Sequence, residues 1–161
     1  MTATALHLMH FEGGDALSPF RAQALLARLQ AACPRITAVV ARHVHWAAFD
    51  SVPDRAAVDK LQALLRYGDD FKGAAAGDRV VVMPRLGTVS PWASKATDIA
   101  RNCGLAPHRL ERVTEYTLAL KNGLLSAARP LNVDERQAAD TGRAASLRGP
   151  AARPHDRKRG L

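Results

Sequence analysis

Hydrophobic and polar positions change their spacing along this chain in a way that predicts strands alternating with helices. A short apolar stretch around Ala5–Met9 indicates a first strand, which Gly13-Gly14 would break. Apolar residues alternate through Ile36–Phe49, which is the pattern of a long strand. The valine run within Arg79–Met83 indicates a buried strand, and the pattern through Leu110–Leu120 predicts a fourth one.

A helix is expected after each strand, because apolar residues then recur at intervals of three and four positions. Ser18-Pro19 and Ser90-Pro91 each place a capping serine before a proline that suits the first helical position. Asp54 is expected to cap the helix between them, and Gly68 to close it. The last helix is predicted near Asn132–Ala139, where its apolar pattern ends.

The third predicted helix has a particular inner face. Its apolar spacing predicts that the buried side chains are Trp92, Ala96, Ile99, Ala100 and Cys103. Gly104 follows directly, and glycine commonly ends a helix because it adopts the left-handed backbone conformation there.

The order β-α-β-α occurs twice, which suggests an internal duplication. Leu17–Phe20 aligns with Val89–Trp92, and a cysteine followed by a helix-stopping residue ends both helices, at Cys33 and Cys103. We therefore predict an α+β fold of two related βα halves, with helices on one side of a mostly antiparallel sheet. The last helix is expected to be incomplete, which would leave apolar sheet surface uncovered and favour self-association.

Charge changes this picture at the C-terminal end, because the formal net charge of +8 is unevenly distributed. Residues 141–161 hold six Lys and Arg against one acidic residue, and contain no Val, Ile, Met or aromatic residue. Such a segment cannot bury enough apolar surface to offset its ordering entropy. We expect one domain at residues 1–140 and a disordered basic tail at 141–161. The tail is either a genuine feature or the product of out-of-frame translation near Asp140.

Composition also limits the partners. Arg153–Arg159 could bind nucleic acid through phosphates, but no aromatic residue lies near it and no recognised nucleic-acid fold precedes it, which argues against that partner. Cys33 and Cys103 are too few for a disulfide framework and suit a reducing compartment. No apolar stretch approaches the roughly 20 residues that span a bilayer. We expect a soluble, cytoplasmic protein with no membrane partner.

The segment Pro84–Ala100 is the most informative part of the chain. It leaves a strand, passes through a glycine-bearing turn, and begins a helix with Ser-Pro and an aromatic residue. Helix initiation in general does not require so many particular residues in a row, so we interpret the segment as an interface with another part of a larger assembly. The candidate interface residues are Pro84, Arg85, Gly87, Thr88, Ser90, Pro91, Trp92, Ser94, Lys95, Thr97 and Asp98.

Two chemical hypotheses compete with that interpretation. Gly87–Ser90, just before a helix N-terminus, could bind a phosphate, although the complete P-loop pattern is missing. His43 and His45 share one strand face and could bind zinc with Cys33 or Cys103, but no ligand spacing of a known type is present. We therefore assign no catalytic, cofactor-binding or metal-binding residue.

The motif resembles a segment near the N-terminus of the large single-chain phosphoribosylformylglycinamidine synthases. The resemblance covers roughly Leu17–Leu120, with Leu86 and Ala93 where the family would have Pro and Ser. Further segments that are similar to the family are His43–Ala47, Leu64–Gly68, Asn102–Leu105 and His108–Arg112.

The resemblance implies a domain like two fused copies of the small separate subunit of split bacterial enzymes. In that family the whole enzyme makes formylglycinamidine ribonucleotide from formylglycinamide ribonucleotide, glutamine and ATP, in purine biosynthesis. Its synthetase domain uses ATP and magnesium, and its glutaminase domain releases ammonia. The N-terminal domain is expected to join these two partners, in cis or in trans, and to shape the ammonia path. The present chain alone is therefore expected to bind no cofactor and to be inactive.

Overall fold

The structure, a computed structural model, describes residues 5–73, 76–85, 87–121 and 129–147, in which strands and helices alternate. None of the described helices is long and apolar enough to cross a membrane. The elements are β1 (His7–Asp15), α1 (Pro19–Ala32), β2 (Ile36–Phe49), α2 (Arg55–Leu65), β3 (Asp78–Val82), α3 (Pro91–Asn102), β4 (Arg109–Leu120) and α4 (Val133–Leu147).

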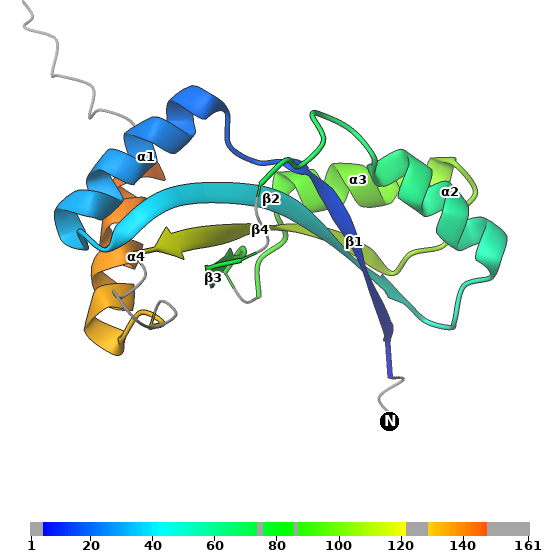
Figure 1. The fold of residues 1–161 in the computed structure, drawn as a ribbon. Helices are drawn as coiled ribbons and strands as arrows, with labels where there is room; N and C mark the ends of the chain where they lie inside the picture. The colour runs from blue at the N-terminus through cyan, green and yellow to red at the C-terminus, as the bar shows by residue number, and fades with distance from the viewer. Residues whose placement is uncertain (1–4, 74–75, 86, 122–128, 148–161) are drawn as a thin grey trace, which may run out of the picture.

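The four described strands form one antiparallel sheet in the order β1-β2-β4-β3 (Figure 1). Each half of the chain contributes one inner strand, β2 or β4, and one outer strand, β1 or β3. His43 lies opposite Thr114 near the middle of the central pair. This mirrored order confirms the predicted α+β fold of two related βα halves.

The helices pack on a single face of the sheet, as predicted. Residues of one strand face alternate with those of the other, and β2 pairs with β4 without a break in register from Ala38 to Ala48. Val39 and Ala41 of β2 belong to the core under α1 and α4. Ala47 and Phe49, which lie on that same face, belong to the core under α2 and α3. The helices thus form two pairs, one at each end of a long curved sheet (Figure 1).

The two cores contain separate sets of apolar side chains. The first core includes Leu25, Leu29, Cys33, Ile36, Val39, Ala41, Tyr116, Leu118, Leu131 and Ala139. The second core includes Phe11, Ala47, Phe49, Leu61, Leu65, Ala100, Leu105 and Leu110. Between them, at the middle of the helix-covered face, the strands carry polar residues instead.

Helix α4 differs from the prediction, because it continues to Leu147 and packs directly on α1. Its start is a capping box: Asn132 Oδ1 accepts from the Glu135 N–H and Glu135 Oε2 accepts from the Asn132 N–H, each at 2.8 Å. Arg35 of the α1–β2 turn pairs with Glu135 at 2.8 Å. The helix thus ends eight residues beyond the predicted end at Ala139. The division into a domain at 1–140 and a basic tail at 141–161 stays a prediction, and residues 148–161 lie outside the described range.

Three further local predictions need correction. β1 continues through Gly13-Gly14 to Asp15, with an irregular register there, so the glycines do not end it. β3 is an edge strand with Val81 54% exposed, not a buried one. α2 ends at the extended C-cap residue Arg66, and Gly68, whose φ is +76°, lies in the turn that follows.

Helix α3 is rotated relative to its predicted inner face. Its buried residues are Ala93, Thr97 and Ala100, whereas Ile99 is 50% exposed. The predicted end is confirmed by a Schellman motif, in which the N–H of Leu105 donates to Ala100 O and that of Gly104 donates to Arg101 O. Gly104 has a φ of +77°, as such a stop requires.

Candidate functional site

The turn before α3 is built from residues of the predicted motif. Thr88 donates through its hydroxyl to Arg85 O at 2.7 Å, and the Thr88 N–H donates to the same carbonyl at 3.1 Å. Gly87 adopts a φ of +80°, a conformation that disfavours any residue with a Cβ. These bonds explain the glycine and the threonine of the motif as turn-forming residues.

Ser90 fastens the start of α3 to strand β4. Its hydroxyl oxygen accepts from the Ala93 N–H at 3.0 Å as an N-cap, and its O–H donates to Glu111 Oε1 at 2.8 Å. Arg109 donates to the other carboxylate oxygen of Glu111 at 2.6 Å and to Thr88 O at 2.9 Å. The turn is therefore tied to β4 through one carboxylate.

Glu111 also bears on the phosphate hypothesis. Partial burial acts to raise the pKa of Glu111, but hydrogen bonds from Arg109 and Ser90 and from the Arg112 backbone outweigh it and lower that pKa. The carboxylate is thus ionised at neutral pH and lies against the helix start where an anion would bind. The Gly87–Ser90 turn is already neutralised by the protein's own anion, which argues against a phosphate site there.

Thr97 connects α3 to the part of the β4 edge that does not pair with β3. Its hydroxyl donates to Ala93 O at 2.7 Å and accepts from the Leu110 N–H at 2.9 Å, both in a buried setting. Strand β3 ends at Val82 opposite Thr114, so it offers no carbonyl to Leu110. The threonine supplies the acceptor that a neighbouring strand would otherwise provide.

Replacing Thr97 by Val is expected to lower the free energy of unfolding by about 1–3 kcal/mol, because the buried Leu110 N–H loses its acceptor while the side-chain volume is conserved. Urea denaturation followed by circular dichroism measures this. Thr88→Val at the exposed turn is the matched control, for which we expect a change below about 1 kcal/mol. Equal stability of Thr97→Val and the parent would show that the bond is not needed.

A polar and aromatic cluster lies between the two cores, centred on His45. His45 is completely buried, and its Nε2 lies 2.9 Å from Tyr67 Oη. Its ring stacks on Trp92 with 5.3 Å between centroids and 28° between planes. Arg112 lies over Trp92, 5.1 Å from the ring centroid, and donates to Tyr67 Oη at 3.3 Å. We call these four residues the histidine cluster.

Gly13 is part of the wall around this cluster. A Cβ added to Gly13 would lie 2.6 Å from His45 Cε1 and 3.0 Å from the carbonyl oxygen of His43. The close approach of the imidazole therefore requires a glycine here, in the part of β1 where the register with β2 is irregular.

Both histidines of β2 are held neutral. Burial, then the charges of His43 and Arg112, lower the pKa of His45 to about 4. Burial and the charge of Arg112 lower the pKa of His43 as well. The Nδ1 atoms of both rings are buried and have no hydrogen-bond partner among the described residues. Both imidazoles are thus uncharged at neutral pH.

The structure does not bring the proposed zinc ligands together. His43 and His45 do share a face, with ring centroids 6.5 Å apart. Cys33 belongs to the first core, and Cys103 is the C-cap of α3. No group of three His, Cys, Asp or Glu side chains within the described ranges could hold a metal ion.

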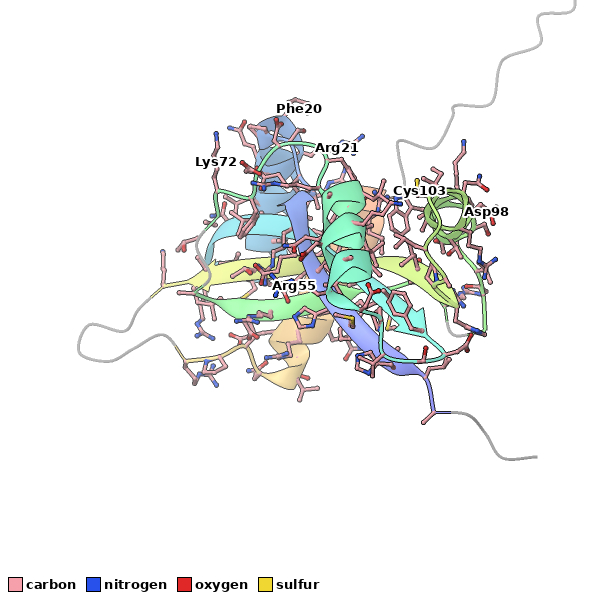
Figure 2. All side chains as sticks on the ribbon, turned by 90° about the vertical axis from the view of Figure 1, so that its right-hand side faces the viewer. Phe20, Arg21, Arg55, Lys72, Asp98 and Cys103 are labelled. Atoms are coloured by element: carbon pink, nitrogen blue, oxygen red, sulfur yellow. The ribbon has the colours of Figure 1, made fainter. Side chains whose placement is uncertain are left out.

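The remaining motif residues face outward. Arg85, Pro91, Ser94, Lys95 and Asp98 are exposed. Asp98 lies on the side of α3 that is turned away from α2 (Figure 2). Pro84 is half-buried. The motif thus divides into residues that build the α3 start and residues that are available to a partner; its role as an interface stays a prediction.

An apolar groove of about 230 Å³ separates α3 from α2. Its floor is Leu110 of β4. The apolar spacing of the third helix places Ile99 on a buried face, so the sequence did not indicate this groove. We define the α2–α3 groove by its lining, which is Leu61, Leu64, Leu65, Tyr67, Trp92, Lys95, Ala96, Ile99, Ala100 and Leu110.

The chain was also compared with models of protein families. Residues 42–143 match the family model described as formylglycinamide ribonucleotide amidotransferase N-terminal. The matched range runs from within β2 into α4 and includes the Pro84–Asp98 motif, the α2–α3 groove and all four residues of the histidine cluster.

Proposed function

Because this chain belongs to the family of formylglycinamide ribonucleotide amidotransferase N-terminal domains, we propose that it serves as the assembly domain of that amidotransferase. In this role it joins the synthetase and glutaminase domains and shapes the path that ammonia takes between them. The partners act in cis or in trans, in the cytoplasm, as part of purine biosynthesis.

The chemistry is assigned to those partner domains. Glutamine is hydrolysed in the glutaminase domain, and the synthetase domain uses ATP and magnesium to activate the amide oxygen of formylglycinamide ribonucleotide for attack by ammonia. The present domain supplies neither cofactor nor catalytic group in this proposal. Its contribution is positional, since ammonia delivered between two sites requires them to stay aligned.

The observation that supports this role is how the motif residues are used. Ser90, Thr97 and Thr88 are bonded to the protein's own backbone and to Glu111, so they are not presented to a substrate. Lys95, an exposed residue of the same motif, instead lines an apolar groove next to Ile99, which is 50% exposed. Exposed apolar side chains of this kind are typical of interaction surfaces.

A reconstitution experiment tests the proposal. An amidotransferase of this family is deprived of its N-terminal domain, and the full 161-residue chain is supplied in trans or fused in its place. We expect the truncated enzyme to lose glutamine-supported amidation by about 10²-fold while it keeps more of its ammonia-supported activity, because free ammonia bypasses the delivery path. Adding the chain is expected to restore the glutamine-supported rate.

The controls separate assembly from catalysis. The chain alone is expected to turn over neither glutamine nor formylglycinamide ribonucleotide. Turnover of either substrate by the chain alone, or failure of the chain both to bind and to restore the truncated enzyme, would contradict the proposed function. Restoration in trans as well as in fusion would favour an independent assembly subunit.

A further inference from the structure

We propose that the α2–α3 groove receives a side-chain anchor from the partner domains, namely a large apolar side chain followed closely by a carboxylate. This inference rests on the proposed function, and it names the surface and the chemistry through which assembly takes place. The groove, the lysine at its border and a comparison of the two ends of the sheet each support it.

The size and lining of the groove indicate the kind of occupant. Its volume of about 230 Å³ lies below the 300–1,000 Å³ that is usual for small-molecule sites. The lining is mostly aliphatic and aromatic, with Leu110 as floor and the half-exposed Leu64 and Ile99 as walls. One large apolar side chain fits such a space better than a metabolite does, as when an anchor residue fills a groove between helices.

Lys95 indicates the charge of the occupant. It is exposed, lines the groove, and has no hydrogen bond or ion pair with any residue in the described ranges. By contrast Lys60, on α2, donates to the Cys103 carbonyl. Because a free ammonium at the border of an apolar groove gains most from a carboxylate, the expected partner segment is acidic beside its apolar anchor.

The opposite end of the sheet shows how a pair of helices can be packed together over a core. α1 and α4 pack directly on each other, and Leu131 and Ala139 enter the first core beside them. A charge pair between Arg35 and Glu135 at 2.8 Å completes that junction.

At the end of the sheet that carries α2 and α3, these two helices do not pack on each other in this way, and the groove lies between them. Lys60 of α2 does bond the Cys103 carbonyl at the end of α3, but the apolar walls of the groove stay uncovered by the described residues. The partner segment would cover them.

The open face of the sheet is the competing surface, and its charges argue against it. Arg42 pairs with Glu12 at 2.8 Å and with Glu115 at 3.0 Å. Arg109 pairs with Glu111 at 2.6 Å. These groups satisfy one another within the chain, whereas Lys95 at the groove has no such partner in the described ranges. The sheet face does expose apolar side chains such as Val81, which makes it a suitable control surface.

The test compares single substitutions on the two surfaces. Binding of the chain to the amidotransferase lacking its N-terminal domain is measured by titration calorimetry for the parent, Ile99→Asp, Lys95→Glu and Val81→Asp. Ile99 and Val81 have similar exposure, 50% and 54%, so both substitutions introduce a carboxylate on the surface. Circular dichroism confirms that each variant is folded.

We expect Ile99→Asp to weaken binding by about 30-fold or more, as loss of an interface anchor does. Lys95→Glu should also weaken binding, and that loss should shrink at high salt because the repulsion it introduces is screened. Val81→Asp should bind like the parent. Normal binding of Ile99→Asp, or weaker binding of Val81→Asp alone, would overturn the groove inference while leaving the proposed function standing. Failure of the parent chain to bind would overturn both.

Discussion

Replacing Leu61 by Ala is expected to lower the free energy of unfolding by about 2–5 kcal/mol, which is the range for a buried leucine that leaves a cavity. Leu61 has no exposed surface, and it lies in the second core with Phe11, Phe49 and Leu110. Only Leu61 and Leu65 of α2 are buried, so the helix depends on these two side chains for its position. Guanidinium denaturation measured by tryptophan fluorescence gives the change.

The neighbouring Leu64 supplies the control for this prediction. It is 37% exposed and lines the groove, so Leu64→Ala should cost less than about 1.5 kcal/mol. If Leu61→Ala and Leu64→Ala were equally mild, α2 would not be anchored as described. Because the groove wall includes Leu61, its substitution should also weaken binding in the reconstitution experiment.

Acidification from pH 6.5 towards pH 4 is expected to destabilise the fold by up to about 3 kcal/mol through His45 alone. The pKa of His45 is about 4 in the folded protein, against an ordinary value of 6.5. Between pH 6.5 and pH 4, His45 is therefore protonated in the unfolded chain but mostly neutral in the folded protein. Stability from this source is complete above pH 6.5 and falls as the pH falls towards 4; His43, whose pKa is also lowered, acts in the same direction.

Denaturation at a series of pH values, with the parent and His45→Gln, measures this dependence. Glutamine does not titrate and can still bond Tyr67, so the variant should show a flatter profile between pH 4 and 6.5 even if it is less stable overall. His10→Gln, at an exposed position of β1, is the matched control substitution, because it leaves the surroundings of His45 in place. A parent profile that is flat in this interval would show that His45 is not held neutral by its surroundings.

Cap residues and strand patterns allowed much of the fold to be predicted from the sequence. Ser18, Asp54 and Ser90 cap their helices as expected, with side chains that accept from Arg21, Ala57 and Ala93 N–H groups. The long strand Ile36–Phe49 has the predicted bounds. Such features depend on residues close in the chain, which is why local chemistry is enough to identify them.

The predictions were wrong where contacts between residues far apart in the chain determine the structure. Ile99 has the spacing of an inner-face residue, yet α3 turns Thr97 inward because the Leu110 N–H at the sheet edge needs an acceptor. α4 was expected to end near Ala139 because its apolar pattern ends there. The helix instead continues to Leu147 and packs on α1, which lies near the other end of the chain.

The candidate site was only partly predictable for the same reason. The motif could be found as an unusual run of residues. Its contact with Glu111 could not be found in this way, because Glu111 lies twenty-one positions after Ser90 in the chain. The groove needs α2 and α3 to be set apart, which no periodicity within either helix indicates. Likewise, His45 meets Tyr67, Trp92 and Arg112 only after four separate segments have come together.

The strand order β1-β2-β4-β3 has a consequence for folding of the chain during its synthesis on the ribosome. β2 is translated well before β4, since α2, β3 and α3 lie between them. Until β4 emerges, a nascent β2 has β1 along one edge and a row of unpaired N–H and C=O groups along the other. Such an unpaired edge can pair with a strand of another chain. Neighbouring nascent copies on one polysome are close enough for this incorrect pairing to occur. Once β4 pairs with β2, the open edge of β2 is satisfied within the same chain, and this route to misassembly is removed.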